Sequence, residues 1–226
     1  MLSSTQLVEL FIVLSTLHTF RYTVSRVRSA FAHAQAKGGP VRPDTVPTGL
    51  RGTLFTALQL IVCFLIPMGY MLAVVVYGLQ QPPWMSAFAL PDVVFGVNLE
   101  GGFWKHLLRV LACATGLLGN RISESAFEHL GDQYHPIGRR ERPRVVQTGP
   151  YAWVRHPLYS LALLQGVSQS LVFWSYVPLF SLVAVAGVFA IKINIEEEVI
   201  QRDDAIMEEY RAYMRKVPAR LVPYVW

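Results

Sequence analysis

Two long stretches of the chain contain no acidic or basic residue. They run from Thr53 to Pro91 and from Pro157 to Ile191. A helix on the surface of a soluble protein carries a polar stripe on every turn, and neither stretch shows one. Uninterrupted apolar runs longer than about 18 residues are typical of membrane-spanning helices. The pattern therefore predicts an all-α integral membrane protein.

The first half of the chain contains two apolar segments separated by a loop rich in helix breakers. An apolar run at 7–20, interrupted by Glu9, predicts a first helix that continues as an amphipathic helix to about Ala34. A second helix is expected at about 53–78. Pro67 lies inside this run and predicts a kink, because proline removes a backbone hydrogen bond from a helix interior.

The second half predicts a third helix and a hairpin. The third helix is expected at 103–129, apolar at first and strongly polar in its second half. As a single helix, 157–191 would extend about 52 Å, against a hydrocarbon core of about 30 Å. A break at 173–178 resolves this and leaves two helices, at 156–173 and 177–194, the second continuing beyond the membrane.

Apolar residues recur at helical spacing after this hairpin. Tyr210, Tyr213 and Val217 belong to this series, which is interrupted at Asp203. The spacing predicts an amphipathic C-terminal helix that ends before Pro218. The fold expected from the pattern is thus about five transmembrane helices followed by this amphipathic helix.

Composition excludes several classes of protein. Hydrophobic residues make up 53% of the chain and charged residues 15%, whereas soluble domains carry about 25% charged residues. These values exclude a secreted disulfide scaffold, a disordered protein and a soluble nucleic-acid binder. The net charge of +5 belongs in loops beside a membrane. The two cysteines both lie in apolar runs and give no disulfide or metal framework.

Basic residues gather in alternate connecting segments. The segments 21–51 and 131–155 are rich in Arg and Lys, whereas 80–102 has two acids and no Lys or Arg. Under the positive-inside rule, the basic segments lie together on the cytosolic side. This predicts five spans, an N-terminus outside or in the lumen, and a cytosolic C-terminus. Four spans, without the first helix, fit the later segments equally well.

Two groups of charged residues are costly at a membrane boundary and are therefore candidates for function. Arg121, Glu124 and Glu128 recur on one face of the third helix. They form either a salt-bridged stripe at the membrane surface or the polar wall of a cavity. The acids 196–198 follow the last span, and successive side chains on a helix point about 100° apart. At least one of these three should therefore face inward.

A third candidate functional segment precedes the hairpin. Gly149-Pro150 predicts a turn, and His156-Pro157 suits the start of the next helix. We expect the N–H groups at that helix N-terminus to be free for an anionic group. Tyr151 and Tyr159 add π-faces for a flat base or a cation.

These segments resemble the isoprenylcysteine carboxyl methyltransferase family, within a wider group that includes phospholipid methyltransferases. The resemblance covers about residues 110–226. It is carried by G-P-Y-x-x-x-R-H-P-x-Y at 149–159 and by E-E-Y-x-x-Y-x-x-x-V-P at 208–218. We accordingly expect a single membrane domain, with N-terminal helices at 1–102 and a methyltransferase core at 103–226.

The resemblance implies a methyltransferase of the endoplasmic reticulum membrane with a cytosolic cofactor pocket for S-adenosylmethionine. Its substrate would be the C-terminal carboxylate of prenylated cysteine in proteins or peptides, entering from membrane lipid, with no part for nucleic acid or metal. Two groups of positions in this chain match those that bind the cofactor in the family. They are Pro143, Arg144, Val145, Val146, Tyr151, His156, Pro157, Leu158 and Tyr159, together with Glu198 or, shifted by one residue, Glu197.

Methyl transfer to a carboxylate requires alignment of the two reactants and does not require a base. An α-carboxyl group has a pKa of about 3.5 and is already ionised at neutral pH, so alignment and exclusion of water are the main tasks. Where the family has an arginine to hold the substrate carboxylate, this chain has Asn194. Arg121 matches an arginine in the family's third-span region, and we expect Arg121 and Asn194 to be the catalytic positions.

Asn194 also favours a different acceptor. N-methylation of a phospholipid or another amine on the same scaffold needs no cationic clamp. It needs a base, for which Glu197 and His129 are candidates. A third alternative is a non-catalytic relative that has kept the fold, because fold alone does not assign function.

Overall fold

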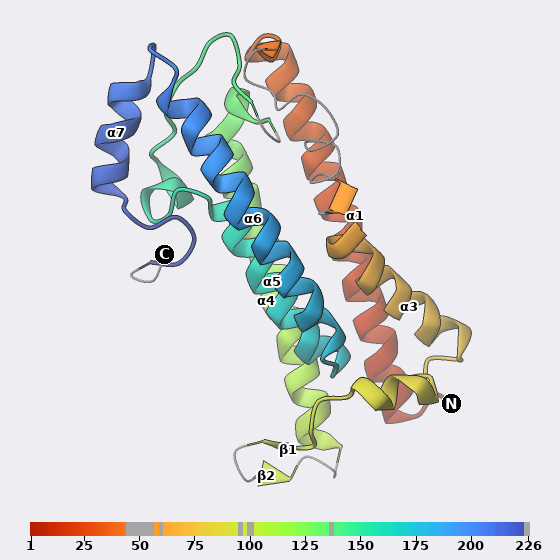
Figure 1. Cartoon of the computed structure of the whole chain (residues 1–226). Helices are drawn as coiled ribbons and strands as arrows, with labels where there is room; N and C mark the ends of the chain where they lie inside the picture. The colour runs from red at the N-terminus through yellow and green to blue at the C-terminus, as the bar shows by residue number, and fades with distance from the viewer. Residues whose placement is uncertain (44–56, 59–60, 95–96, 99–101, 136–137, 224–226) are drawn as a thin grey trace. The chain divides into compact units, whose positions relative to one another are not determined.

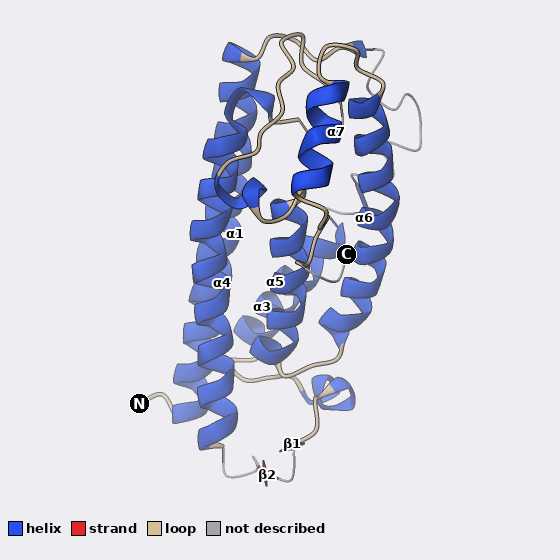
Figure 2. Cartoon of the chain, turned by 90° about the vertical axis from the view of Figure 1, so that its left-hand side faces the viewer, coloured by secondary structure: helices blue, strands red, loops and turns tan. Residues whose placement is uncertain are grey.

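The computed structural model describes residues 1–43, 57–58, 61–94, 97–98, 102–135 and 138–223. Helices predominate in these residues (Figures 1 and 2). The strands among them are a single antiparallel pair, β1 (Val93–Val94) and β2 (Val97–Asn98). The all-helical class predicted from the hydrophobic pattern is confirmed.

The helices match most of the expected boundaries. In chain order they are α1 (Ser4–Lys37), a π-helix at Ile61–Leu65, α3 (Ile66–Val76), α4 (Phe103–Leu130), α5 (Pro157–Phe173), α6 (Val177–Gln201) and α7 (Met207–Lys216). Short 3-10 turns occur at Pro83–Phe88, Gly131–Gln133 and Gly149–Ala152.

The predicted hairpin break occurs, and the helix type changes just before Pro67, where a kink was predicted. The π-helix directly precedes Pro67 in the first turn of α3; the expected start of this helix at 53–56 lies outside the described residues. Trp174 separates α5 from α6 with a φ of 53°, a conformation uncommon for a residue with a side chain. The Ser175 hydroxyl then accepts the N–H of Val177 at 3.2 Å and caps the new helix.

The C-terminal arm differs in one respect from the pattern. Helix α6 ends at Gln201, and a turn centred on Asp203 separates it from α7. The Asp203 carboxylate accepts a hydrogen bond from the N–H of Ala205 at 3.3 Å and pairs with Arg42 at 3.0 Å. The amphipathic helix is confirmed as the separate element α7, with Tyr210 and Tyr213 on its buried face.

Among the residues that the structure describes, two helices are long and apolar enough to span a membrane. They are α1 and α6, and a shorter apolar helix occupies Cys63–Val76. Only 17% of the apolar window of α1 and 33% of that of α6 are buried inside the protein. A core helix of a soluble protein would be mostly covered, so these windows are suited to contact with lipid. The count of five spans is not confirmed.

The chain divides into two compact units that are interleaved along the sequence. Unit 1 contains Met1–Tyr22, Leu60–Asn120 and Leu163–Val185, and unit 2 contains Thr23–Gln59, Arg121–Ala162 and Ala186–Trp226. Helices α1, α4, α5 and α6 therefore contribute to both units. The residues predicted to bind the cofactor or to act in catalysis all belong to unit 2.

A buried ion pair lies inside unit 1. Arg109 of α4 and Glu9 of α1 are 2.7 Å apart, between NH1 and Oε1, with side chains 2% and 1% exposed. Arg109 also donates to the hydroxyl of Tyr70 at 3.1 Å and to the carbonyl of Val172 at 2.8 Å. Gln81 donates to Glu9 at 3.0 Å. These bonds connect α1, α3, α4 and α5, and they explain how the apolar first helix accommodates an acid.

Glu9→Gln is expected to destabilise the protein strongly. The substitution keeps the shape of the side chain but leaves the Arg109 guanidinium buried without a counter-charge. Breaking one side of a buried pair costs about 3–5 kcal/mol. The midpoint of thermal unfolding, measured on the purified protein in detergent, should fall accordingly.

Lys105→Met is the matched control for this measurement. Lys105 pairs with Asp92 at 2.8 Å in the same unit, but both side chains are partly exposed. A pair of this kind contributes about 0–1 kcal/mol. Equal shifts for the two variants would contradict a special role for the buried pair.

Candidate functional site

The turn at 149–152 is built around a glycine that no other residue could replace easily. Gly149 has a φ of 59°, and a Cβ atom there would lie 2.6 Å from the ring of His129. The turn places Tyr151 in a buried cluster with Val146, against which Leu158 of α5 packs. Three of the predicted cofactor positions are thereby brought into contact.

Helix α7 fixes this turn from the other side. The Tyr213 hydroxyl donates a hydrogen bond to the carbonyl of Tyr151 at 2.7 Å. Tyr213 packs with Tyr210 and Val217, and Val145 packs against the three. Burial raises the pKa of Tyr151 and of Tyr213 well above the usual tyrosine value. Both phenols therefore stay neutral, and neither is suited to act as a base.

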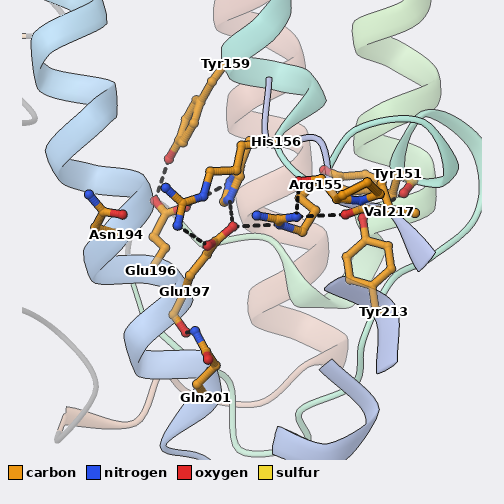
Figure 3. A network of polar contacts seen from close by, with 12 residues as sticks. Tyr151, Arg155, His156, Tyr159, Asn194, Glu196, Glu197, Gln201, Tyr213 and Val217 are labelled. Carbon is orange, nitrogen blue, oxygen red and sulfur yellow. Dashed lines mark hydrogen bonds and ion pairs between the residues drawn. The ribbon is translucent and has the colours of Figure 1, made fainter. Parts of the chain in front are cut away.

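Glu197 of α6 is the centre of a group of three cationic or basic side chains (Figure 3). Its Oε1 accepts hydrogen bonds from Arg155 Nε at 2.8 Å and from His156 Nε2 at 3.2 Å. Its Oε2 pairs with Arg220 NH2 at 3.0 Å. The Glu197 side chain is almost fully buried. A buried carboxylate is costly unless it is paired, and here both of its oxygens have partners.

Glu196, the preceding residue, forms a second group beside the first (Figure 3). The Tyr159 hydroxyl donates to Glu196 Oε1 at 2.5 Å. His156 Nδ1 lies 3.6 Å and Lys192 Nζ 3.9 Å from its carboxylate. The Tyr159 ring stacks between the rings of His156 and Phe189. His156 therefore lies between the two carboxylates and contacts both.

The segment 217–221, called the C-terminal tail below, completes the surroundings of Arg155. Arg155 NH1 donates to the carbonyls of Val217 at 2.8 Å and Pro218 at 2.6 Å. Because its Nε donates to Glu197, the Arg155 guanidinium is held on both sides. It connects the acid on α6 with the tail and is fixed in one orientation.

The tail also accepts hydrogen bonds from the backbone immediately before α5. The N–H of Arg155 donates to the carbonyl of Ala219 at 3.0 Å, and the N–H of His156 donates to that of Arg220 at 2.9 Å. The next residue, Pro157, has no N–H. The tail therefore holds the two residues before α5. The expectation of free N–H groups at the start of α5 is wrong for Tyr159 and Ser160, whose N–H groups donate to the carbonyl of His156.

Arg144, in the segment that leads into the turn, is held by side chains of the Gly131–Gln133 turn. The N–H of Arg144 donates to Gln133 Oε1 at 3.1 Å, and its guanidinium contacts Asp132 Oδ1 at 2.9 and 3.0 Å. Burial acts to raise the pKa of Asp132, but hydrogen bonds from Gln133 and Arg144 outweigh it and lower that pKa. The carboxylate therefore stays ionised. Pro143, the residue before Arg144, is half-buried.

Three other predicted residues lie apart from the two carboxylates. The Glu198 side chain is exposed and pairs with Arg202 on its own helix. Arg121 is 82% exposed and pairs with Glu124 at 3.4 Å. The exposed Asn194 side chain donates to the backbone carbonyl one turn earlier on α6 at 2.9 Å. The structure therefore brings Glu197 together with the Tyr151 and His156 segment, whereas these three contact their own helices.

Four residues of the cluster were given no cofactor or catalytic role from the sequence, although Glu196 was among the candidate acids: Arg155, Lys192, Glu196 and Arg220. A signal existed for two of them, since Lys192 and Glu196 are four residues apart and therefore adjacent on one helix face. Arg155 stood inside the recognised motif but was given no role. For Arg220 the sequence offers no local signal, because its contact with Glu197 joins positions far apart in the chain.

Comparison with known proteins supports a membrane methyltransferase. Residues 107–203 match the family described as phospholipid methyltransferase. This family belongs to the same membrane methyltransferase superfamily as the isoprenylcysteine carboxyl methyltransferases. The match covers less than half of the chain and ends before α7 and the tail. No curated protein matches the sequence.

Tyr213→Phe should loosen the turn that carries Tyr151. The variant keeps the ring in its apolar cluster and leaves the buried carbonyl of Tyr151 without its donor. The expected loss of stability is about 1–3 kcal/mol, measured by thermal unfolding. Tyr210→Phe removes a hydroxyl from the same helix without touching that bond and should have a smaller effect. Equal losses for the two variants would contradict the role of the Tyr213 hydroxyl.

Proposed function

We propose that the cluster around Glu196 and Glu197 binds S-adenosylmethionine and that the chain transfers its methyl group to an acceptor anchored in lipid. The sulfonium and ammonium groups of this cofactor are cations. Carboxylates are favourable partners for cations, and the cluster offers the neighbouring acids Glu196 and Glu197, of which Glu197 is almost fully buried. This donor set is the observation that carries the proposal.

When bound, S-adenosylmethionine supplies an electrophilic methyl group on a positively charged sulfur. The contribution of the chain is to place fixed charges around it. Arg155 and His156 hold Glu197 in a single orientation, and the Tyr159 hydroxyl does the same for Glu196. Side chains fixed in advance need no reorganisation during the reaction.

The charge balance of the cluster favours an anionic acceptor. Three basic side chains, Arg155, Lys192 and Arg220, surround the two acids, which leaves an excess of positive charge when Lys192 is protonated. An ionised carboxylate matches that excess and needs no base for methylation. We therefore propose the C-terminal carboxylate of a prenylated cysteine as the acceptor, in a protein of the endoplasmic reticulum membrane with a cytosolic C-terminus.

Lys192 is the residue of the cluster best suited to hold such a carboxylate. Its side chain is almost fully buried, 3.9 Å from Glu196 and 5.0 Å from the centre of the Tyr159 ring. Arg121 and Asn194, to which the sequence assigned this role, are engaged with their own helices. Their assignment as catalytic positions stays a prediction.

Amine methylation is the second candidate function. The match of residues 107–203 to the phospholipid methyltransferase family favours it. An amine acceptor must lose a proton, and Glu196, in contact with Tyr159 and His156, is the carboxylate placed to receive it. The two candidate functions share the cofactor and differ in the acceptor.

His156→Ala tests the cofactor site. It removes the contact of the ring with Glu197 and the stacking on Tyr159. A hydrogen bond to a charged group contributes about 1.5–3 kcal/mol, so S-adenosylmethionine should bind about 10- to 100-fold more weakly in calorimetric titration. Trp153→Ala is the control, since Trp153 follows the same turn but is exposed. Unchanged affinity in the His156 variant would contradict the proposal.

An assay that gives the same preparation a carboxylate acceptor and an amine acceptor distinguishes the two candidate functions. Methyl transfer from labelled S-adenosylmethionine to N-acetyl-S-farnesylcysteine is expected, with little transfer to phosphatidylethanolamine. The reverse result would establish the second candidate function. Lys192→Met should lower the rate with the carboxylate acceptor while leaving cofactor affinity close to that of the wild type.

A further inference from the structure

Arg220 stands apart from the other residues that contact Glu197. It comes from the C-terminal tail, beyond the segment that matches the methyltransferase family. Its side chain is 28% exposed, whereas that of Arg155 is 7% exposed. Arg220 is therefore the arginine on the solvent side of the Glu197 carboxylate.

The two arginines also differ in how they are fixed. Arg155 contacts Glu197 through Nε and the tail carbonyls through NH1, so moving it would break bonds on both sides. Arg220 is anchored through its backbone, whose carbonyl accepts the N–H of His156 at 2.9 Å. Its guanidinium pairs with Glu197 Oε2, the oxygen that Arg155 and His156 do not use. The backbone and the guanidinium of Arg220 thus contact different groups of the site.

We propose that Arg220 binds the α-carboxylate of the amino-acid group of S-adenosylmethionine while Glu197 binds its ammonium group. This assignment rests on the proposed function and names one part of the same site. An α-amino acid carries its ammonium and carboxylate on a single carbon. A neighbouring acid and arginine therefore carry the complementary pair of charges.

Electrostatic balance supports this exchange. Before binding, Glu197 and Arg220 neutralise each other across 3.0 Å. When the ammonium takes the place of Arg220 beside Glu197, the carboxylate next to it gives the arginine a new partner. One ion pair is replaced by two, and no charge is left buried without a partner, which is the costly outcome. Arginine is also the side chain whose geometry best suits a carboxylate, through two parallel hydrogen bonds.

The experiment compares two ligands that differ only in the carboxylate. S-adenosylmethionine and decarboxylated S-adenosylmethionine are titrated calorimetrically into the full-length wild type and into Arg220→Ala. The variant keeps the tail carbonyls that pair with Arg155 and His156. Its affinity for S-adenosylmethionine should fall about 10- to 100-fold, the loss expected for a hydrogen bond to a charged group. Its affinity for the decarboxylated ligand should stay unchanged or rise.

Two further variants sharpen the comparison. Arg220→Lys keeps the charge without the planar guanidinium and should recover part of the lost affinity. Arg211→Ala removes the same charge from α7, where Arg211 pairs with Glu208, and should change neither affinity. Thermal unfolding of all variants shows whether each is folded.

The outcomes separate this assignment from the proposed function. If Arg220→Ala weakened both ligands equally, left both unchanged, or strengthened both, the role of Arg220 would be wrong while the cofactor site stood. If the wild type bound neither ligand, the proposed function would be wrong and the role of Arg220 with it. Selective loss of the ligand that carries the carboxylate would establish the assignment.

Discussion

The burial of the Glu197 carboxylate is the constraint on which the rest of unit 2 depends. A charge removed from water must be paired and hydrogen-bonded, or it destabilises the fold by several kcal/mol. The partners of Glu197 come from the start of α5 and from the tail. Pairing one acid therefore brings together segments that are distant in the sequence, and the turn that carries Tyr151 is held between them.

The same constraint organises unit 1 with different residues. Glu9 and Arg109 are buried among apolar side chains of α1, α3 and α4. Dispersion and apolar burial give helices little orientational preference inside a lipid bilayer, where the surrounding chains are equally apolar. A paired charge requires a defined register between the helices that supply it. Each unit thus has a buried, ion-paired carboxylate, Glu9 in unit 1 and Glu197 in unit 2, that constrains how its helices pack.

The hydrophobic pattern was sufficient to predict elements whose ends are marked locally. The hairpin break follows from the length of an apolar run, and α7 follows from the spacing of its tyrosines. The turn centred on Asp203 was visible only as a gap, because Asp203 is satisfied by Arg42, a residue far away in the chain. Local periodicity carries no information about such a partner.

In the site too, the sequence predicted the parts that local motifs set and missed the parts that depend on distant residues. Tyr151, His156, Tyr159 and Glu197 lie together as expected, since the motifs that contain them include the turn and the helix start that position them. The backbone bonds from Arg155 and His156 to the tail were not predicted, because their acceptors lie far away in the chain. Arg220 was missed because nothing in its neighbours indicates that its side chain reaches α6.

The position of the tail in the chain also determines the order in which the parts of the site are synthesised. Helices α4 to α6 and the Tyr151 turn precede residues 217–221, so each can form while synthesis continues, as segments made first generally fold first. The carbonyls that hold Arg155 and the third partner of Glu197 arrive only with those late residues. During biosynthesis, the partly made chain therefore holds the two acids without their third cation. The cluster gains its excess of positive charge only when the tail has been made.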